Sequence, residues 1–583
     1  MTEGNNFKQI LLDLGLGEKT RFVGLITRDN DKFYLNSDDR RLKSPIRILD
    51  TKGLEENLKA QVEITAWQDL YSEPQGKLIK ILGVAGEHET EMSAIMVAGD
   101  IIFDFPAEVE KEAEIAKANF SDSLIEETKT RRDFRDVLTF TIDPETAKDF
   151  DDAISIRTLE KDWYEVGVHI ADVSYFVTPG SALDREAAQR ATSIYMVDRT
   201  IPMLPEILSN ELCSLVPNQE RLTFSAVFEI NKKGDIRNEW YGRTIIKSAK
   251  RFTYEQVQEI LDNKKGQYAE ELDTLNMIAY ALRKLKIEAG AISLDDHEVY
   301  FVLDENMKPI EAKVKVRTDS HKLVEDFMLL ANKKVAEYAS AQNKKAGSFV
   351  YRIHDVPEQE KLSALAGFLK PLGYELKTDR TNSSKALNKL LDSTVGLPEE
   401  NMIQRATIRS MAKAIYSTHN IGHFGLAFSH YTHFTSPIRR YPDLMVHRLL
   451  DIYLHGKVPA TEILDYCAVQ AEHSSTMEQR AAVAERESIK FKQAEYMLAH
   501  LGETRSGIIS GVTDFGMFVE DLESGSDGLV RMRDMKDDFY VFDEKKILMK
   551  GKRHGKVYRL GDAVKIMPVK ADPARRQIDY KLV

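Results

Sequence analysis

The hydrophobic positions near the start of the chain alternate with polar ones over short distances. Between residues 21 and 100 the alternating runs are RFVGLIT, KFYLN, QVEITAW and KLIKILGVAG, and the turn-rich pieces RDND and NSDDRR lie between them. Apolar residues at every second position are typical of half-buried strands, and several short strands at this spacing favour a small β-barrel. We therefore predict a barrel over residues 21–100, after a short N-terminal extension of residues 1–20.

The pattern then changes twice. Residues 101–135 contain the charged segment AEVEKEAEIAKANFSDSLIEETKTRRDFR, which lacks strand alternation and predicts a helical connector. Over residues 136–500 strand and helix patterns are mixed in one block, which ends in the helical segment RESIKFKQAEYMLAH. Residues 501–583 return to glycine-punctuated strands such as GIISGVTDFGMFVEDL, which predict a second barrel. The predicted fold class is multidomain α+β, with a large mixed α/β domain between two small β-barrels.

Composition and length agree with this organisation. The chain has 583 residues, of which 43% are hydrophobic and 30% charged, as is usual for globular proteins of several domains. No run approaches the length of a membrane span, and the N-terminus lacks the features of a signal peptide, so we expect no membrane association. The two cysteines, Cys213 and Cys467, are too few for a cysteine-ligated zinc site and suit a reducing compartment, so we expect a cytoplasmic location.

The segment TIDPETAKDFDDA, residues 141–153, crowds four aspartates into a short stretch: Asp143, Asp149, Asp151 and Asp152. Two carboxylates about 4 Å apart repel by roughly 4 kcal/mol at an effective dielectric constant of 20. The chain can relieve this by exposing the side chains to water or by placing a cation between them. Apolar, strand-like segments on both sides favour a rigid loop between two strands, and therefore a cation.

The kind of cation follows from the ligands. A helix–loop–helix calcium loop fits badly, because its glycine and its closing glutamate at the twelfth position are missing. Carboxylate oxygens still bind hard cations, and Mg²⁺ is favoured if the substrate brings phosphate. The net charge of −12 alone counts against nucleic acid as a partner, but it does not exclude local basic surfaces.

Five longer motifs occur in order: TIDPETAKDFDDAISI, HIADVSYFVTPGSALDREA, SIYMVDRTIPMLPEILSNELCSL, GHFGLAF and HFTSPIRRYPDLMVHRLL. Together they resemble the catalytic RNB domain of the ribonuclease II/ribonuclease R family, and the residues of these motifs are more similar to the ribonuclease R branch than to ribonuclease II. The N-terminal barrel is similar to that family's second cold-shock domain, and the C-terminal one to an RNA-binding domain of the ribosomal-protein S1 type. Both barrels are therefore expected to have the OB fold.

The resemblance implies processive hydrolysis of single-stranded RNA from its 3′ end, with release of nucleoside 5′-monophosphates. It implies two divalent ions, Mg²⁺ with Mn²⁺ as a substitute, which activate water and neutralise the leaving oxygen. By correspondence Asp143, Asp149 and Asp152 are the metal ligands. Asp151 lies at the catalytic centre, where it orients either the attacking water or a metal-bound one. Arg439 matches the arginine that binds the scissile phosphate; the alternative, from spacing alone, is that Arg439 or Arg440 caps a helix or pairs with Asp443.

Further residues are expected to hold RNA. Tyr195 matches a tyrosine that stacks on a terminal base, although its apolar neighbours would otherwise favour the core. Leu294 stands where relatives usually have a phenylalanine on the other side of that base. Glu325 and Glu485 match glutamates near the 3′-terminal nucleotide, where they would bind the ribose 2′-hydroxyl; each can equally be an exposed helix charge.

The C-terminal barrel reads as a binding module. From residue 503 to 583 it holds 16 Lys and Arg against 14 Asp and Glu, and the basic residues cluster in KKILMKGKRHGKVYR. Phe515, Phe539 and Tyr540 are candidate stacking rings beside this basic track, whereas Phe518 is expected to lie in the barrel core. No obligate protein partner is evident.

Some alternatives stay open. His423, His433 and His447 do not have the spacing of a compact metal site, so we expect structural roles. One cold-shock-like barrel instead of two, and no lysine-rich tail, make digestion of duplex RNA doubtful. A non-enzymatic RNA-binding regulator with a degenerate site is a rival interpretation, as is an endonuclease or a DNA-directed nuclease. The four aspartates argue for an enzyme.

Overall fold

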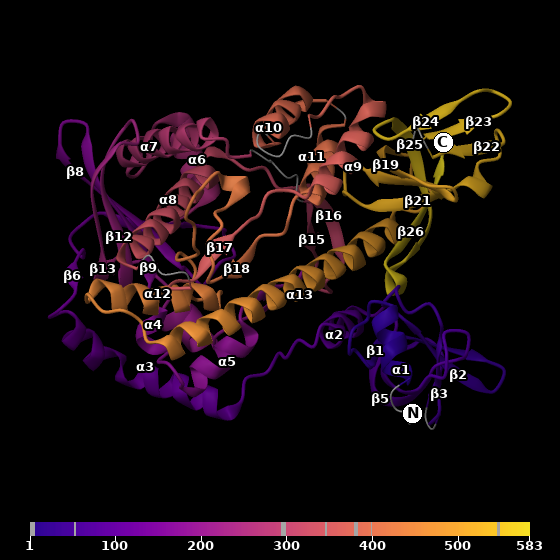
Figure 1. Ribbon diagram of the computed structural model, residues 1–583, viewed down its shortest axis with the longest axis horizontal. Helices are drawn as coiled ribbons and strands as arrows, with labels where there is room; N and C mark the ends of the chain where they lie inside the picture. Colours follow the sequence, from indigo (N-terminus) through magenta and orange to yellow (C-terminus); the bar gives the residue numbers. More distant parts are fainter. Residues whose placement is uncertain are drawn as a thin grey trace.

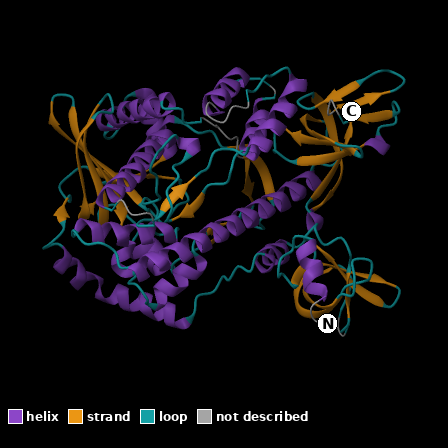
Figure 2. Cartoon of the chain, viewed as in Figure 1, coloured by secondary structure: helices purple, strands orange, loops and turns teal. Residues whose placement is uncertain are grey.

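The computed structural model describes residues 6–51, 54–292, 299–343, 347–377, 383–397, 399–544 and 548–583. In Figure 1 the chain forms a large block on the left, and the N-terminal barrel (indigo) and C-terminal barrel (yellow) lie at its right-hand end. Figure 2 shows that the barrels consist mainly of strands, whereas the block mixes strands and helices. The predicted fold class, a mixed α/β domain with a small barrel on each side, is confirmed.

The N-terminal barrel is closed by five strands in the order β1-β2-β3-β5-β4. Their bounds are β1 (Arg21–Asp29), β2 (Lys32–Ser37), β3 (Ile46–Ile48), β4 (Leu58–Ala66) and β5 (Gln75–Val84). Gly24 lets β1 pass close to β2, because an added Cβ would lie 2.0 Å from the carbonyl oxygen of Asn36. Helix α1 (Asn6–Asp13) contributes Ile10 and Leu11 to the barrel core. Helix α2 (His88–Ala98), which the sequence pattern did not predict, follows β5.

The central block is built on a seven-stranded sheet in the order β14-β7-β8-β9-β12-β13-β6. The strands are β6 (Arg132–Asp133), β7 (Thr139–Asp143), β8 (Asp152–Glu160), β9 (Trp163–Ala171), β12 (Glu220–Asn231), β13 (Ile236–Lys247) and β14 (Lys250–Thr253). Strand β12 is buried at almost every position, so its sequence ERLTFSAVFEIN is nearly continuous in buried residues instead of alternating. In Figure 1, α6, α7 and α8 lie above this sheet and α3, α4 and α5 below it.

The helices that follow α3 in the described part of this block are α4 (Val173–Phe176), α5 (Ala182–Arg190), α6 (Tyr254–Asn263), α7 (Ala269–Glu288), α8 (Asp319–Gln342), α9 (Gln359–Leu369), α10 (Ser383–Thr394), α11 (Glu400–Ser410), α12 (Tyr441–Leu454) and α13 (Thr461–Ala499). Helix α3 (Ala107–Glu127) lies where the sequence predicts a helical connector. Three small sheets pair β10 (Ile194–Tyr195) with β11 (Thr200–Ile201), β15 (Val299–Leu303) with β16 (Pro309–Val314), and β17 (Tyr351–Ile353) with β18 (Ile415–Ser417). The long helix α13 runs from the block to the barrels (Figure 1).

The C-terminal barrel is also closed, in the order β19-β20-β21-β26-β25. Its strands are β19 (Arg505–Val512), β20 (Gly516–Asp521), β21 (Asp527–Arg531), β25 (Ala563–Asp572) and β26 (Gln577–Leu582), and a 3₁₀ turn, η7 (Pro573–Arg575), joins the last two. A three-stranded sheet is attached: β22 (Tyr540–Asp543), β23 (Leu548–Gly551) and β24 (Val557–Arg559).

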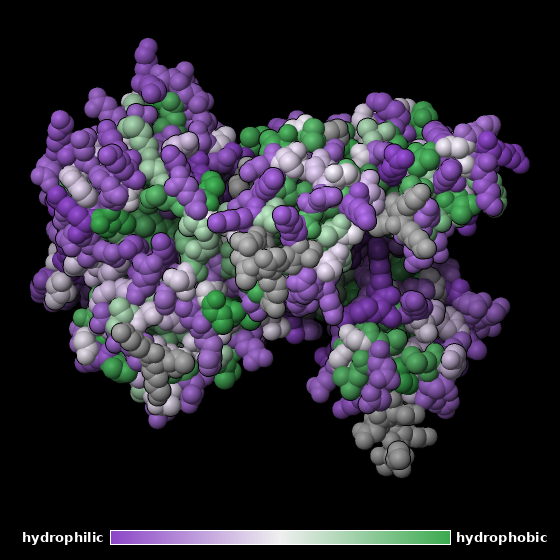
Figure 3. Space-filling model, turned by 45° about the horizontal axis from the view of Figure 1, so that its top comes forward, coloured by the Kyte–Doolittle hydropathy of each residue, from purple (hydrophilic) through white to green (hydrophobic). Residues whose placement is uncertain are grey.

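A cluster of buried and half-buried charges joins the two barrels to each other and to α13. This barrel junction consists of Asp38, Lys59, Glu91, Glu487 and Arg576. The Nζ atom of Lys59, fully buried, lies 2.7 Å from Asp38, and Arg576 of the C-terminal barrel donates to Glu487 at 2.9 Å. A hollow lined with hydrophilic side chains lies between the barrels (Figure 3). Within the described ranges, no helix is both long enough and apolar enough to cross a membrane.

Candidate active site

The four aspartates lie where two neighbouring strands of the large sheet are joined. Strand β7 ends at Asp143, β8 begins at Asp152, and Asp149 and Asp151 lie in the connection between them. The connection is bound to one neighbouring segment: Phe150 donates through its backbone N–H to Ser214 Oγ at 3.0 Å, and its carbonyl accepts from the N–H of Leu215 at 3.0 Å. The predicted loop between two strands is therefore present, and hydrogen bonds anchor it.

Asp151 brings together segments that are far apart in the sequence. Its Oδ1 accepts a hydrogen bond from the backbone N–H of Ile438 at 2.9 Å, and its Oδ2 lies 3.5 Å from Arg439 Nε. Arg439 is 41% exposed, so its guanidinium still faces solvent. The pairing with Asp443 that spacing allowed for either arginine is made by Arg440, at 2.7 Å. Arg439 instead donates from Nη2 to Ser436 Oγ at 3.0 Å.

Burial makes this cluster costly to ionise. Burial raises the pKa of Asp143, which the charges of Asp151 and Asp149 raise further, and burial raises the pKa of Asp152, which the charge of Asp143 raises further. Burial likewise raises the pKa of Asp149 and, more strongly, that of Asp151, where Arg439 acts in the opposite direction. The Oδ2 atom of Asp143 is buried without a hydrogen-bond partner. An unsatisfied buried oxygen among crowded carboxylates fits a site that binds cations.

The carboxylate oxygens of the four aspartates lie near one another, but no three of these residues have oxygens that all lie within 4.8 Å of each other. Among the described side chains, one group of three gathers its potential ligand atoms within 4.8 Å, and that group is His88, Glu89 and Asp198. A cation held by the aspartates therefore needs further ligands, and phosphate oxygens of a substrate can supply them.

Tyr195 lies beside this cluster on a short hairpin made by β10 and β11. The residues just before it are tied to the arginine segment, because the N–H of Ser193 donates to the carbonyl of Arg439 at 3.0 Å. Tyr195 is 39% exposed, which is compatible with stacking. Burial raises the pKa of its hydroxyl, Arg439 lowers it, and Asp149 and Asp151 raise it, so these charged groups lie near the Tyr195 hydroxyl.

The structure adds Tyr254, which sequence reasoning missed. This residue begins α6, and its ring stacks on His321 with centroids 4.0 Å apart. Burial raises the pKa of Tyr254, with further contributions from Asp152 and Asp143. The pairing of strands places Tyr254 near the aspartates, because β14 pairs with β7 so that Thr253, the residue before Tyr254, lies opposite Asp143. Without the strand order, the segment KRFTYEQV carries no sign of this proximity.

The other residues predicted to contact the terminal nucleotide differ in their surroundings. Glu325, on α8, forms an ion pair with Arg317. Glu485 is exposed on α13, one turn before Ser488, whose hydroxyl accepts from the N–H of Val197 in the Tyr195 hairpin. Leu294 lies outside the described residues.

The C-terminal rings require two corrections. Tyr540 is 4% exposed, its hydroxyl donates to Asp537 and its ring contacts Tyr558, so it belongs to the barrel core and not to a stacking surface. Phe518, which was expected in the core, is 37% exposed and packs edge-on against Phe515. Alternation in β20 explains this, because Met517 and Val519 point inward and Phe518 therefore outward.

Two further rings fit the expectation of an accessible surface. Phe515 is 54% and Phe539 62% exposed, and the ammonium of Lys552 lies 5.2 Å from the centroid of Phe539.

The three histidines considered earlier all make hydrogen bonds. His423 Nδ1 accepts from a backbone N–H, His447 Nε2 bonds a backbone carbonyl and His433 Nδ1 bonds a tyrosine hydroxyl.

Comparison with known proteins agrees with this geometry. The RNB domain model matches residues 131–456, the cold shock domain model residues 34–106 and the S1 RNA binding domain model residues 499–581. The chain is 39% identical to ribonuclease R 1 of Lactococcus lactis over 97% of its own length and 69% of that protein. The chain belongs to the ribonuclease R family. Another family member, from Thermotoga maritima, is 38% identical over 97% of this chain and 80% of its own.

Solved structures of the family have the same fold. Ribonuclease R of Mycoplasma genitalium, in complex with ribose-methylated single-stranded RNA, superimposes with a TM-score of 0.85 at 28% identity, over 97% of this chain and 90% of that one. Yeast Ssd1, described as a pseudonuclease, superimposes with a TM-score of 0.71 at 21% identity, over 91% of this chain and 67% of its own. The second likeness concerns the fold alone, so activity has to be argued from the site.

Proposed function

We infer that the chain is a 3′-to-5′ exoribonuclease of single-stranded RNA, and we propose that it releases nucleoside 5′-monophosphates processively. The activity follows from its membership of the ribonuclease R family. The observation that carries the proposed chemistry is the contact of Asp151 with the Ile438–Arg439 segment, which brings a buried carboxylate and a phosphate-binding cation together. A relative bound to single-stranded RNA supports the same substrate.

We propose that Asp143, Asp149 and Asp152 hold two Mg²⁺ ions, for which Mn²⁺ can substitute. The raised pKa values of these carboxyl groups and the unpartnered Oδ2 of Asp143 support this assignment. When bound, the ions supply an activated water and a neutralised leaving oxygen. Because metal binds the deprotonated carboxylate, binding also offsets the repulsion that burial makes expensive.

The remaining steps belong to the chain's own side chains. Asp151 accepts a hydrogen bond from the attacking water and orients it, while Ile438 N–H fixes the other carboxylate oxygen. Arg439 binds the phosphate oxygens with its fork of N–H donors and stays charged at every working pH. Tyr195 stacks on the terminal base without regard to its identity, which suits an enzyme that digests any sequence.

Recognition of ribose and the path of the strand involve other residues. We propose that Glu325 and Glu485 accept hydrogen bonds from ribose 2′-hydroxyls near the 3′ end. The exposed rings of Phe515, Phe518 and Phe539, with Lys552 beside the last, form a stacking surface for single strands further out. The low cysteine content still favours the cytoplasm as the location.

The test uses single-stranded RNA labelled at the 3′ or the 5′ end, with Mg²⁺. Label at the 3′ end should appear at once as mononucleotide, and label at the 5′ end only in a short final product. Internal fragments early in the reaction would contradict exonucleolytic digestion. Equal digestion of DNA would contradict the assignment of the glutamates to the 2′-hydroxyl.

A further inference from the structure

Helix α2 connects the N-terminal barrel to the hairpin that carries Tyr195. It packs against the hairpin and α13 through a small apolar cluster, in which Met92 and Ile95 of α2 meet Ile194 and Met196 of the hairpin and Phe491 of α13. The ring of His88, at the start of α2, also lies near Phe491. Structural elements of three parts of the chain therefore meet at α2.

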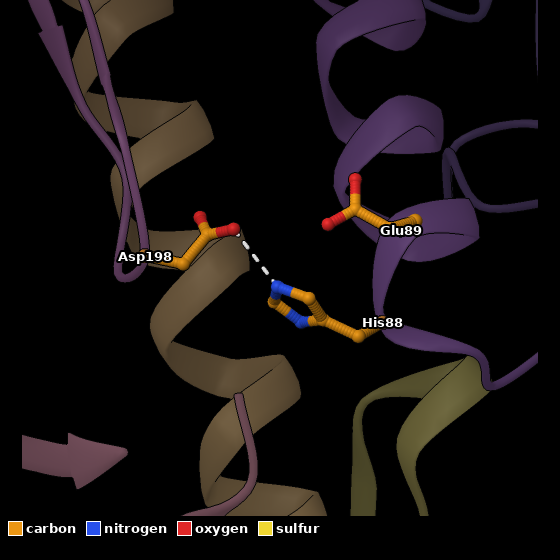
Figure 4. A group of neighbouring side chains, drawn as sticks. All are labelled: His88, Glu89 and Asp198. Atoms are coloured by element: carbon orange, nitrogen blue, oxygen red, sulfur yellow. Dashed lines mark hydrogen bonds and ion pairs between the residues drawn. The ribbon is translucent and has the colours of Figure 1, made fainter. Parts of the chain in front are cut away.

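Charged contacts strengthen this meeting point. His88 Nε2 and Asp198 Oδ2 are 2.8 Å apart, and the Asp198 side chain, in the turn of the hairpin, is only 2% exposed (Figure 4). Arg199 bonds both carboxylates, with Nη2 2.6 Å from Asp198 and 2.7 Å from Glu89. We call these four residues, His88, Glu89, Asp198 and Arg199, the hairpin latch.

A metal ion is the alternative occupant of this place, because His88, Glu89 and Asp198 have the required proximity. The guanidinium of Arg199 argues against it. It already lies between the two carboxylates at hydrogen-bond distance, so the chain supplies the positive charge that an ion would bring. The latch is therefore an ion-pair contact between two structural units.

The latch holds an element that needs support. The hairpin consists of two strands of two residues each, and a two-stranded hairpin is marginally stable at best without tertiary contacts. The N–H of Val197 donates to Ser488 of α13, and the N–H of Ser193 donates to the arginine segment. The latch provides a third attachment, three residues after Tyr195.

We propose that His88 and Asp198 are positioning residues for Tyr195. By fixing the hairpin from the side of the N-terminal barrel, they make the length of the final RNA product depend on a contact outside the active site. This inference rests on the proposed stacking of Tyr195 on the terminal base. It concerns the short products at the end of digestion, because long RNA is also held by contacts along the barrels.

The experiment compares limit products of 5′-labelled single-stranded RNA from the parent enzyme and four variants. Tyr195→Ala should release longer products, because loss of stacking weakens retention of a short strand about tenfold. His88→Ala should also lengthen the products, with a smaller loss of retention of about threefold. His88→Gln, whose amide can still donate to Asp198, should restore the parent pattern. The double variant His88→Ala/Tyr195→Ala should give the same ladder as Tyr195→Ala.

A matched control is Arg480→Ala, which removes an exposed 3.9 Å ion pair between α13 and Asp100, just after α2. It should leave the ladder unchanged. Initial rates on long RNA should stay within about twofold of the parent for His88→Ala, since the reacting groups are untouched. If His88→Ala does not fold, Glu89→Gln provides the second variant, because it removes the outer support of Arg199.

The outcomes separate the two levels of the argument. Longer products from Tyr195→Ala together with a parent ladder from His88→Ala overturn the positioning role and leave the role of Tyr195 standing. A parent ladder from Tyr195→Ala overturns both. A ladder from His88→Gln that matches His88→Ala contradicts the hydrogen bond as the basis of the effect.

Discussion

Two clusters of buried and half-buried carboxylates in this protein differ in the cations that lie beside them. At the barrel junction, Asp38, Glu91 and Glu487 lie 2.7 to 3.8 Å from the charged groups of Lys59 and Arg576. At the active site, four aspartates share one such contact among the described residues, the 3.5 Å approach of Arg439 to Asp151. At the junction the chain itself places two cations beside three carboxylates, whereas a single arginine lies beside one of the four aspartates, and we propose that divalent ions supply the positive charge that is missing there.

The largest expected effect separates the clusters by activity. Asp151→Asn should lower RNA hydrolysis by about 10³-fold or more, while RNA affinity changes less than about twofold, because the carboxylate acts on the reacting groups and the barrels provide the grip. Single-turnover cleavage and filter binding measure the two quantities. Asp38→Asn at the junction is the matched control and should retain turnover. Parent-like hydrolysis by Asp151→Asn would remove this loop from the active site.

The second effect concerns stability. Lys59→Met leaves Asp38 and Glu91 buried without their nearest cation, so it should destabilise the N-terminal barrel by about 3–5 kcal/mol. Thermal unfolding followed by calorimetry should show an earlier first transition. As a control, Lys129→Ala breaks an exposed pair with Glu126 and should change stability by less than about 1 kcal/mol. Equal losses of stability in the two variants would mean that the ion pairs of the junction contribute no more than an exposed surface pair.

The third effect links metal to pH. The folded-state pKa values of the active-site aspartates are raised, so the folded state binds more protons than the unfolded chain between the ordinary carboxyl range and these raised values. Stability of the metal-free protein should therefore fall as pH rises through that window. Saturation with Mg²⁺ at about a hundred times its Kd should stabilise the protein by about 2.7 kcal/mol where the carboxyls are ionised, and by less in acid. Melting curves with and without Mg²⁺ at several pH values test this, and an equal shift at every pH would contradict it.

The smallest expected effect reverses the usual sign of a mutation. Asp152→Asn removes one of the repelling carboxylates, so in the absence of metal at alkaline pH it should stabilise the protein by about 1 kcal/mol while activity is lost. Glu487→Gln at the junction removes a partner of Arg576. Burial raises the pKa of Glu487, but Lys490 and Arg576 lower it below its ordinary value, so this variant should destabilise the protein instead. Thermal unfolding in a chelator measures both. Destabilisation by Asp152→Asn under these conditions would show that the active-site cluster is balanced by the chain itself.

The sequence alone determined the architecture, and it supplied the site residues as predictions. Alternation near both ends gave the barrels, because a half-buried strand needs apolar residues at every second position. The strand-like flanks of the aspartate run predicted a loop between two strands, as found for β7 and β8. Local pattern fails where burial depends on a partner: Phe518 was assigned to the core and Tyr540 to the surface, and the structure reverses both.

Tertiary structure alone decided the long-range contacts. Asp151 meets Ile438 across 287 positions of the chain, and Tyr254 approaches the aspartates because β14 pairs with β7. The latch between His88 and Asp198 joins residues 110 positions apart, and although Asp198 lies in one of the family motifs, nothing in the sequence pairs it with His88. Hydrophobic periodicity specifies which face of an element is buried. It does not specify which other element covers that face, and the polar groups that meet there are therefore known only once the elements are packed.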